Sequence, residues 1–277
     1  MTATASVLAP DRGGALRPRG SRVRWTFTDA LTMTWRNLVG YTRVPEAIFF
    51  SSVQPIMFVL LFRYVFAGAI QVPGPGGYVD YMMPGIFVQT VAFGSVATAI
   101  GLSEDLQKGL IERFRALPMA RSAVLAGRTT ADLVRNVLVV CLMTGVGYLV
   151  GFRVTTDVFS FLAGALVLLL FGYALSWGFA TIGLSAPTSE TAQLMSFPLL
   201  FPLTFASSAF VPVASMPGWL QAFALHQPLS LAVNAARSLM VGGPYHNPGS
   251  VWQSVAWSVG IFAVLSPLAV WRYRRTA

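Results

Sequence analysis

The sequence predicts an all-α membrane protein, because both its composition and its charge distribution differ from those of soluble domains. Hydrophobic residues make up 55% of the 277 residues and charged residues only 10%, with a mean hydropathy of +0.64. Soluble domains carry roughly 25% charged residues. No Asp, Glu, Lys or Arg occurs between Asp157 and Glu190, nor between Pro198 and Arg237. Because about 20 apolar residues in a helix cross the hydrocarbon core, these stretches predict membrane-spanning helices.

Two parts of the chain differ in composition. Residues 1–22 are small, polar and Arg-containing, and they lack the apolar core of a signal peptide, so we expect a disordered cytoplasmic tail. Residues 23–277 are expected to form one transmembrane domain. It begins with an amphipathic elbow helix, in which Phe27, Leu31 and Trp35 recur at helical spacing between Arg24 and Arg43. Such a helix lies in the membrane interface or packs beneath the bundle.

Six apolar segments follow, which predicts about six transmembrane helices. Their expected bounds are 47–70, 81–102, 132–151, 159–184, 191–211 and 251–270. Residues 212–250 are nearly uncharged but broken by Pro and Gly, and they are expected to form an outer re-entrant segment before the last span. Non-helical backbone persists at membrane depth only where protein or a cavity covers it.

The basic residues predict the orientation in the membrane. Sixteen of the 19 Lys and Arg residues fall on one side of the predicted topology: before the first span, in the loop 103–128, at the start of the third span and after the last. Cytoplasmic loops are enriched in Lys and Arg. Both termini are therefore expected in the cytoplasm of a multi-pass protein of the cell membrane, and an even number of spans fits this arrangement.

Several classes of function are disfavoured by missing residues. A nucleotide-binding GxxxxGK(S/T) loop needs a lysine, and the single lysine, Lys108, lies between Gln107 and Gly109. We therefore expect no enzyme and no cofactor in this chain. His226 and His246 have no nearby carboxylate or cysteine, so no metal site is predicted. The net charge of +9 follows from the cytoplasmic loops, and no nucleic-acid partner is expected.

The loop 103–128 carries the strongest local pattern. Leu106, Leu110, Phe114 and Leu117 share one helical face, and charged residues occupy the remainder. Lys108 and Glu112 have the i,i+4 spacing of an ion pair, and Pro118 stops the helix. The pattern fits a cytoplasmic helix that presses on a soluble motor, and it fits equally an interfacial helix with a solvated face.

The same loop resembles that of ABC-2 type exporter permeases of the daunorubicin-resistance type. The resemblance rests on an acidic pair, a Gly, a Glu-Arg-basic run and a Pro-small-Arg ending, here Glu104, Asp105, Gly109, Glu112, Arg113, Arg115, Pro118 and Arg121. Residues 34–66 also resemble the elbow helix and first span of that family, and residues 205–243 its outer re-entrant region. Leu231 departs from the family, which tends to place an aromatic, His or polar residue there.

The resemblance implies the permease subunit of an exporter that moves an amphipathic drug-like or lipid-like substrate. It implies a separate cytoplasmic ABC ATPase that binds Mg-ATP, and a second permease copy or sister permease within the bilayer. The ATPase-coupling interface would comprise Glu104, Asp105, Lys108, Glu112, Arg113, Arg115 and Leu117. The alternative is a channel or carrier not driven by ATP.

Polar residues within the predicted spans are the candidates for substrate contact. They are Gln54, Arg63, Gln89 and Gln193. Arg63 lies about seven residues from the outer end of its span, so its side chain can also reach the interface or a structural partner. Asp132 and Arg135, three residues apart, are interpreted as a structural ion pair near the cytoplasmic end of the third span.

Overall fold

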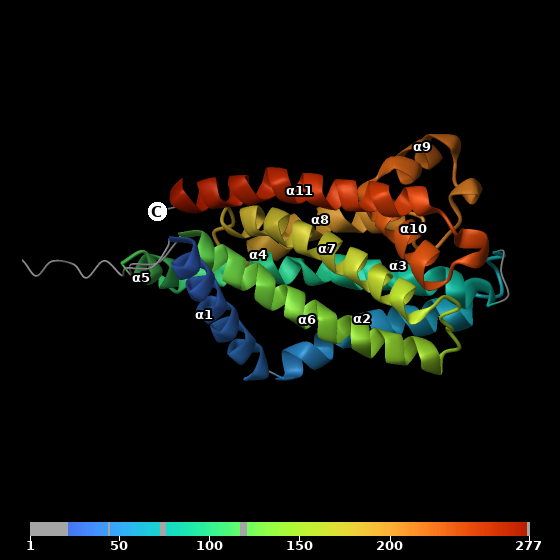
Figure 1. Ribbon diagram of the computed structural model, residues 1–277, viewed down its shortest axis with the longest axis horizontal. Helices are drawn as coiled ribbons and strands as arrows, with labels where there is room; N and C mark the ends of the chain where they lie inside the picture. The colour runs from blue at the N-terminus through green and yellow to red at the C-terminus, as the bar shows by residue number, and fades with distance from the viewer. Residues whose placement is uncertain (1–21, 44, 73–75, 117–120, 276–277) are drawn as a thin grey trace, which may run out of the picture.

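The computed structural model describes residues 22–43, 45–72, 76–116 and 121–275, and in these ranges the chain folds into an elongated bundle of helices (Figure 1). The predicted tail lies almost wholly outside the described residues. One end of the bundle carries α5 and the C-terminus, and the opposite end carries α9 and α10. These are called below the α5 end and the α10 end.

The helices follow the predicted order. They are α1 (Arg22–Thr42), α2 (Pro45–Leu61) with the π-helical turn η1 (Phe62–Phe66), α3 (Gly77–Gly94), α4 (Val96–Gln107), α5 (Leu110–Ala116), α6 (Arg121–Leu149), α7 (Val158–Gly183), α8 (Ser189–Phe205), α9 (Gly218–His226), α10 (Pro228–Met240) and α11 (Pro248–Arg275). Short 3₁₀ turns occur at Val213–Ser215 and Gly243–Tyr245.

Four helices of the described chain are long and apolar enough to cross a membrane. They cover Gly77–Gln107, Ser122–Leu149, Val158–Gly183 and Pro248–Arg275. The fold is thus that of an all-α, multi-pass membrane protein. The other two predicted spans correspond to the shorter helices α2, whose apolar part is Ser52–Phe66, and α8, which has 17 residues.

Two helix bounds differ clearly from the prediction. Helix α6 begins at residue 121 rather than 132, so the last eight residues of the predicted cytoplasmic loop, 121–128, belong to a long helix. Helix α8 ends at Phe205 rather than Val211. Its last residues are followed by a turn in which Ser207 Oγ donates to Thr204 O at 2.5 Å, and the chain then leaves the helix axis.

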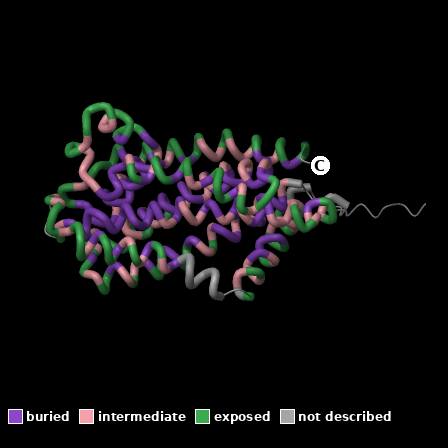
Figure 2. The backbone as a smooth tube through the Cα atoms, turned by 180° about the vertical axis from the view of Figure 1, so that it is seen from behind, coloured by how far each residue is buried: buried purple, intermediate pink, exposed green. Residues whose placement is uncertain are grey.

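Close backbone contacts hold the bundle together. A Cβ added at Gly85 of α3 would lie 2.3 Å from Ala209 O, and one at Gly183 of α7 would lie 2.4 Å from Ala99 O. Small residues allow membrane helices to approach in this way. Helix α3 is the central helix, with fourteen of its residues buried, and the buried stretches run along the middle of the bundle (Figure 2).

Helix α1 crosses the bundle at an angle and packs on α6 (Figure 1). Gly127 of α6 lies against Met33, since a Cβ there would be 2.4 Å from Met33 Cβ. The packed face buries Met33, while Phe27, Leu31 and Trp35 are 71%, 60% and 70% exposed. The aromatic face predicted from the sequence therefore points away from the bundle.

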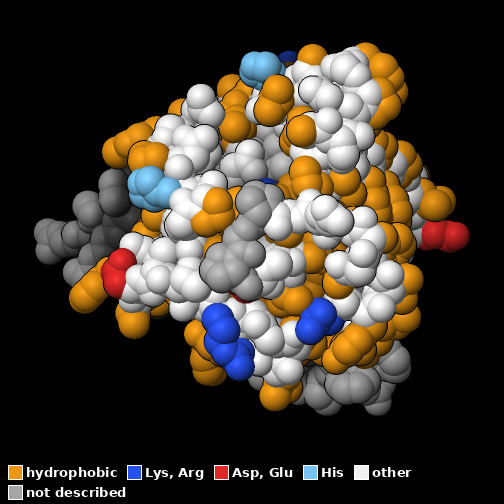
Figure 3. Space-filling model, turned by 90° about the vertical axis from the view of Figure 1, so that its right-hand side faces the viewer, with side chains coloured by type: hydrophobic (Ala, Val, Ile, Leu, Met, Phe, Trp, Pro, Cys, Tyr) orange, Lys and Arg blue, Asp and Glu red, His pale blue; other side chains and the backbone are white. Residues whose placement is uncertain are grey.

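At the α10 end, Arg237 holds the turn that follows α8. The guanidinium donates to the carbonyl of Tyr81 at 2.8 Å and to those of Ser208 and Ala209, and it lies 3.6 Å from the centre of the Tyr81 ring. Its side chain is buried, and no carboxylate within the described residues forms an ion pair with it. Figure 3 shows this end from outside, with few charged side chains on a largely hydrophobic and uncharged surface.

Candidate functional site: an amide- and aromatic-lined cavity

A cavity of about 330 Å³ lies between α2, the α3–α4 pair, α6 and α8. It is lined by Gln54, Pro55, Phe58, Gln89, Thr90, Phe93, Gly94, Val96, Ala97, Ile100, Arg135, Asn136, Val139, Gln193 and Phe197. The phenylalanines and aliphatic residues make most of the wall, and amides and one guanidinium interrupt it. A mostly apolar wall with a few polar groups is typical of small-molecule sites.

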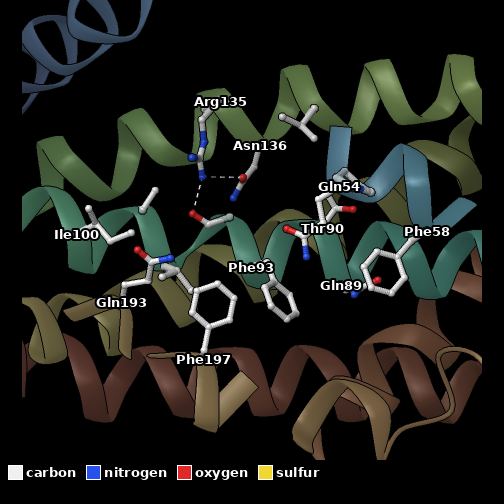
Figure 4. Close-up of a pocket in the computed structure, with 15 residues that line it drawn as sticks. Gln54, Phe58, Gln89, Thr90, Phe93, Ile100, Arg135, Asn136, Gln193 and Phe197 are labelled. Carbon is white, nitrogen blue, oxygen red and sulfur yellow. Dashed lines mark hydrogen bonds between the residues drawn. The ribbon is translucent and has the colours of Figure 1, made fainter. Parts of the chain in front are cut away.

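Three of the four residues predicted to contact substrate lie in this cavity. Gln54, Gln89 and Gln193 come from α2, α3 and α8, three different helices. Figure 4 shows Gln54 and Gln89 near Phe58 at one end and Gln193 beside Ile100 at the other. The side-chain oxygen of Gln89 is buried and has no hydrogen-bond partner. Their contact with substrate stays a prediction.

Arg63, the fourth predicted residue, is placed elsewhere. Its Nε donates to Val150 O at 3.2 Å, and its guanidinium lies 5.8 Å from the centre of the Tyr64 ring. The side chain thus ties the end of the first apolar helix to the end of α6. For Arg63 the sequence allowed either contact with substrate or a structural partner, and the structure shows a structural partner.

The cavity lies beside a break between α3 and α4. Gly94 ends α3 and Val96 begins α4, so Ser95 joins two helices that together cover one membrane span. Ser95 Oγ donates to Val91 O at 3.1 Å and lies 3.0 Å from Gly172 O of α7, which supports the break from the far side. The Gly94 carbonyl accepts a hydrogen bond from Arg135. The break is therefore fixed by α7 on one side and by α6 on the cavity side.

The predicted ion pair between Asp132 and Arg135 is wrong. Asp132 instead lies 3.7 Å from Arg128, one helical turn earlier, and accepts hydrogen bonds from Tyr41 of α1 and Thr98 of α4. Arg135 donates to Gly94 O and to Asn136 Oδ1 at 3.4 Å. The difference arises because the neighbouring helices supply partners that spacing along α6 does not reveal.

The predicted coupling segment is two helices rather than one. Helix α4 ends at Gln107 and α5 begins at Leu110, because Gly109 has a φ of +64° that few other residues adopt. Lys108 consequently pairs with Glu104 at 3.2 Å and not with Glu112, so that predicted pair is wrong. Ile111 is buried and Leu106 and Phe114 pack around it, whereas Glu112 and Arg113 are exposed.

An ion pair joins this segment to α1. Arg36 donates to Asp105 Oδ2 at 2.8 Å, and its guanidinium lies 4.7 Å from the centre of the Phe114 ring of α5. Helix α1 therefore contacts both α4 and α5 through a single side chain. Of the other predicted coupling residues, Arg115 belongs to α5 but its side chain is not described, and Leu117 lies outside the described residues, as does the predicted helix stop at Pro118.

Sequence reasoning missed three residues that organise these sites. Arg36 and Tyr41 lie within the predicted elbow helix but were given no role, and Arg237 marked only the end of an uncharged stretch. For Arg237 a signal was available, because an isolated arginine follows a long uncharged stretch, and such residues face the protein interior. For Tyr41 the sequence holds no signal, since its partner Asp132 is 91 residues away.

Comparison with known proteins identifies the family. Residues 28–241 match the model of the ABC-2 type transporter family. The chain is similar to the "Daunorubicin resistance ABC transporter permease protein DrrB1" of Streptomyces coeruleorubidus, with 34% identity over 88% of this chain and 85% of the relative. It is also similar to the "Probable doxorubicin resistance ABC transporter permease protein DrrC" of Mycobacterium tuberculosis, with 29% identity over 98% and 96%, and to the "Putative transport permease ycf38" of Cyanophora paradoxa, with 24% identity over 82% and 79%.

Members of this family are membrane subunits, and the ATPase activity resides in a separate ABC subunit. The comparisons therefore favour a permease subunit over a channel or carrier that is not driven by ATP. They also imply a partner ATP-binding subunit. The matched residues include most of α1 and the whole cavity. They also include the Arg237 clamp, by which we mean Arg237 and the three carbonyls to which it donates. The chain belongs to the ABC-2 type transporter family and is a permease subunit of an ABC transporter.

Proposed function

We propose that this permease exports an amphipathic drug-like or lipid-like molecule across the cell membrane, and that the cavity is part of the substrate pathway. The cavity carries this proposal. Its volume suits a drug-sized molecule, and its wall combines phenylalanines with amides from four helices. The names of two relatives, which state daunorubicin and doxorubicin resistance, support the substrate class.

The membrane topology that we propose has six spans, with both termini in the cytoplasm. Helix α8 is short but lies alongside α4 and α7, and its 17 residues fall at the lower limit for crossing the hydrocarbon core. Helix α2 with η1 has a similar apolar length. The basic residues of the α5 end, with Arg272, Arg274 and Arg275 after the last helix, support a cytoplasmic α5 end.

Helix α1 is proposed to be an elbow helix in the membrane interface. Its exposed face carries Phe27, Leu31 and Trp35, and an exposed aromatic face is costly in water but favourable at the level of the lipid headgroups. The opposite face packs on α6. Helix α1 would thus lie at the cytoplasmic surface, where it contacts the segment that faces the ATPase.

Helix α5 and the preceding turn are proposed to bind the ATPase. Lys108, Glu112 and Arg113 are exposed at the α5 end, while Ile111 anchors the helix to the core. ATP can drive transport only if it favours one conformation of the permease over another. Arg36 joins α5 to α1, and Tyr41 joins α1 to Asp132, one turn from the cavity residue Arg135. Movement of α5 would reach the cavity through these contacts.

A co-purification experiment tests this function. The tagged permease is expressed with its cytoplasmic ABC ATPase, as wild type and as Glu112→Ala/Arg113→Ala, with His246→Ala at the α10 end as the control. We expect the ATPase to co-purify with wild type and control, and the double variant to lose it or to lose ATP turnover that responds to substrate. The proposal fails if the wild type binds no ATPase or if the double variant behaves as the control.

A second permease copy or a sister permease is proposed to complete the pathway. Gln54 and Gln193, on α2 and α8, line the cavity and yet are exposed in the single chain, so the cavity opens on that side. A second bundle against α2 and α8 would close it. Cysteine cross-linking between Gln54→Cys or Gln193→Cys subunits in the membrane tests this arrangement, and monomers only would contradict it.

A further inference from the structure

We propose that the cavity selects amphiphiles that carry an anionic group, such as a sulfonate, carboxylate or phosphate, over cationic ones, and that Arg135 is the specificity-determining residue. This inference rests on the proposed function, because it assigns a substrate class to the same cavity. It follows from the charges of the wall, and it distinguishes this chain from the two relatives named for resistance to daunorubicin and doxorubicin, which are amines and carry a positive charge at neutral pH.

The fifteen residues of the cavity wall include one charged side chain, Arg135, and no carboxylate. The nearest candidate for neutralising it is Asp132, one turn earlier on α6. Asp132 is fully buried and is already engaged by Arg128, Tyr41 and Thr98. Asp132 thus forms its ion pair with Arg128, and Arg135 forms no ion pair with a carboxylate of the described residues.

The hydrogen bonds of Arg135 leave it able to bind a ligand. Its partners are neutral oxygens, the carbonyl of Gly94 and the side chain of Asn136, and its Nε is buried without a hydrogen-bond partner. A guanidinium has five N–H donors and binds carboxylate and phosphate groups in a forked geometry. Figure 4 shows Arg135 and Asn136 between the Gln54–Gln89 end and the Gln193 end of the cavity.

The surroundings strengthen the effect of this charge. Charges attract more strongly in a medium of low polarity than in water, and the wall is mostly apolar. A cationic group in the cavity would face Arg135 with no carboxylate of the wall to offset the repulsion. Gln89 Oε1 is buried without a partner, so it can accept a hydrogen bond from a hydroxyl or N–H of the same ligand. Phe58, Phe93 and Phe197 provide surface for an aromatic or lipid-like body.

Three probes with one skeleton test the proposal: anilinonaphthalene sulfonate, phenylnaphthylamine without the sulfonate, and a trimethylammonium analogue. The permease with its ATPase is placed in phosphatidylcholine nanodiscs, and binding fluorescence is corrected with empty nanodiscs. Stimulation of ATP turnover is measured in parallel. The variants are Arg135→Gln, Arg135→Lys, and Arg63→Gln as a control for an arginine outside the cavity.

We expect the sulfonate to bind roughly tenfold more tightly than the neutral probe, a difference of about 1.4 kcal/mol, and the trimethylammonium analogue to bind most weakly. Arg135→Gln should abolish the preference for the sulfonate and leave the affinity of the neutral probe within about twofold of wild type. Arg135→Lys should keep most of the preference for the sulfonate because the charge remains. Arg63→Gln should behave as wild type.

Two other results would overturn the inference and can be told apart. If all probes stimulate ATP turnover with no charge preference, or if the cationic analogue binds best, the selectivity is wrong while the export function stands. If no probe binds above the empty nanodiscs or alters ATP turnover, the cavity is not the pathway, and the proposed function loses its supporting observation as well.

Discussion

The arginine side chains at the two ends of the bundle have different kinds of partner. At the α5 end, Arg36 pairs with Asp105 and Arg128 with Asp132, so that cations on two helices meet carboxylates on α4 and α6. At the α10 end, Arg237 pairs with no carboxylate of the described residues and is held by three backbone carbonyls, the Tyr81 ring and the side-chain oxygen of Asn234. Both ends satisfy their charges, but with different kinds of partner.

The difference indicates which end can rearrange. A side-chain ion pair can exchange one partner for another with a small change in rotamers, and several carboxylates and guanidiniums lie within reach at the α5 end. Backbone carbonyls at Tyr81, Ser208 and Ala209 cannot move without moving their helices or the turn after α8. We infer that the α10 end is the fixed part of the bundle and that conformational change begins at the α5 end.

The largest predicted effect is at Arg237. Arg237→Leu removes the donor that serves three carbonyls in a buried site, so we expect the free energy of unfolding to fall by about 3 kcal/mol or more. Titration with dodecyl sulfate in mixed micelles measures this. Arg237→Lys keeps a charge and up to three donors and should fall between wild type and Arg237→Leu. A loss below 1 kcal/mol for Arg237→Leu would show that the α10 end is not clamped in this way.

A smaller effect is expected at Asp132. Asp132→Ala leaves Tyr41 and Thr98 without their acceptor and Arg128 without its ion pair, which we expect to cost about 2 kcal/mol of the free energy of unfolding. Asp132→Asn keeps an acceptor and should lose less. The same titration measures both variants, and equal losses would show that the charge of Asp132 rather than its hydrogen bonds holds α1 to α4 and α6.

The pair between Arg36 and Asp105 should matter more for coupling than for stability. The Arg36 side chain is 35% exposed, so a double-mutant cycle with Arg36→Ala and Asp105→Ala should give a coupling energy of about 0.5–1 kcal/mol. Because the pair joins α1 to α4 next to α5, we expect substrate-stimulated ATP turnover of the complex to fall in either variant. Unchanged stimulation would remove Arg36 from the proposed route.

The smallest effect concerns Asp157 at the start of α7. Hydrogen bonds from the hydroxyl and backbone N–H of Ser160 hold the pKa of this exposed carboxyl below its ordinary value. A lowered pKa in the folded state means that the carboxylate stabilises the fold at neutral pH and that this contribution is lost as the pH falls through the folded-state pKa. Asp157→Asn should slightly lower Tm at pH 7, and the difference should vanish in acid. A difference independent of pH would contradict the assignment.

The helices were predictable to the extent that apolar length and charge define them. The fourth and sixth predicted spans agree with α7 and α11 to within a few residues at most of their bounds, because charged or polar residues flank uninterrupted apolar runs there. The start of α6 was misplaced because Arg121 and Arg128 indicated a loop, whereas residues 121–131 continue the helix. The end of α8 was misplaced because the turn that replaces its last residues is held by Arg237, 28 and 29 residues later.

The cavity could be predicted only in part. Amides within apolar spans are costly unless they have partners, and this pointed to Gln54, Gln89 and Gln193. Arg135 was misread because spacing along one helix suggested Asp132 as its partner, while the Gly94 carbonyl at the helix break supplies the real one. Contacts between residues tens of positions apart depend on how the helices are arranged, and single-helix patterns contain no information about that arrangement.

The Arg237 clamp also has a consequence for biosynthesis. Its partner Tyr81 precedes it by 156 residues, so the clamp cannot close until the ribosome has made most of the chain. Until then the carbonyls of Tyr81, Ser208 and Ala209 lack the guanidinium that they bind in the finished protein. Chains that stop before α10 would thus keep these buried polar groups without their partner, which is costly within a membrane. The arginine that fixes one end of the mature bundle can therefore do so only after the first 237 residues have been made, with α11 still to follow.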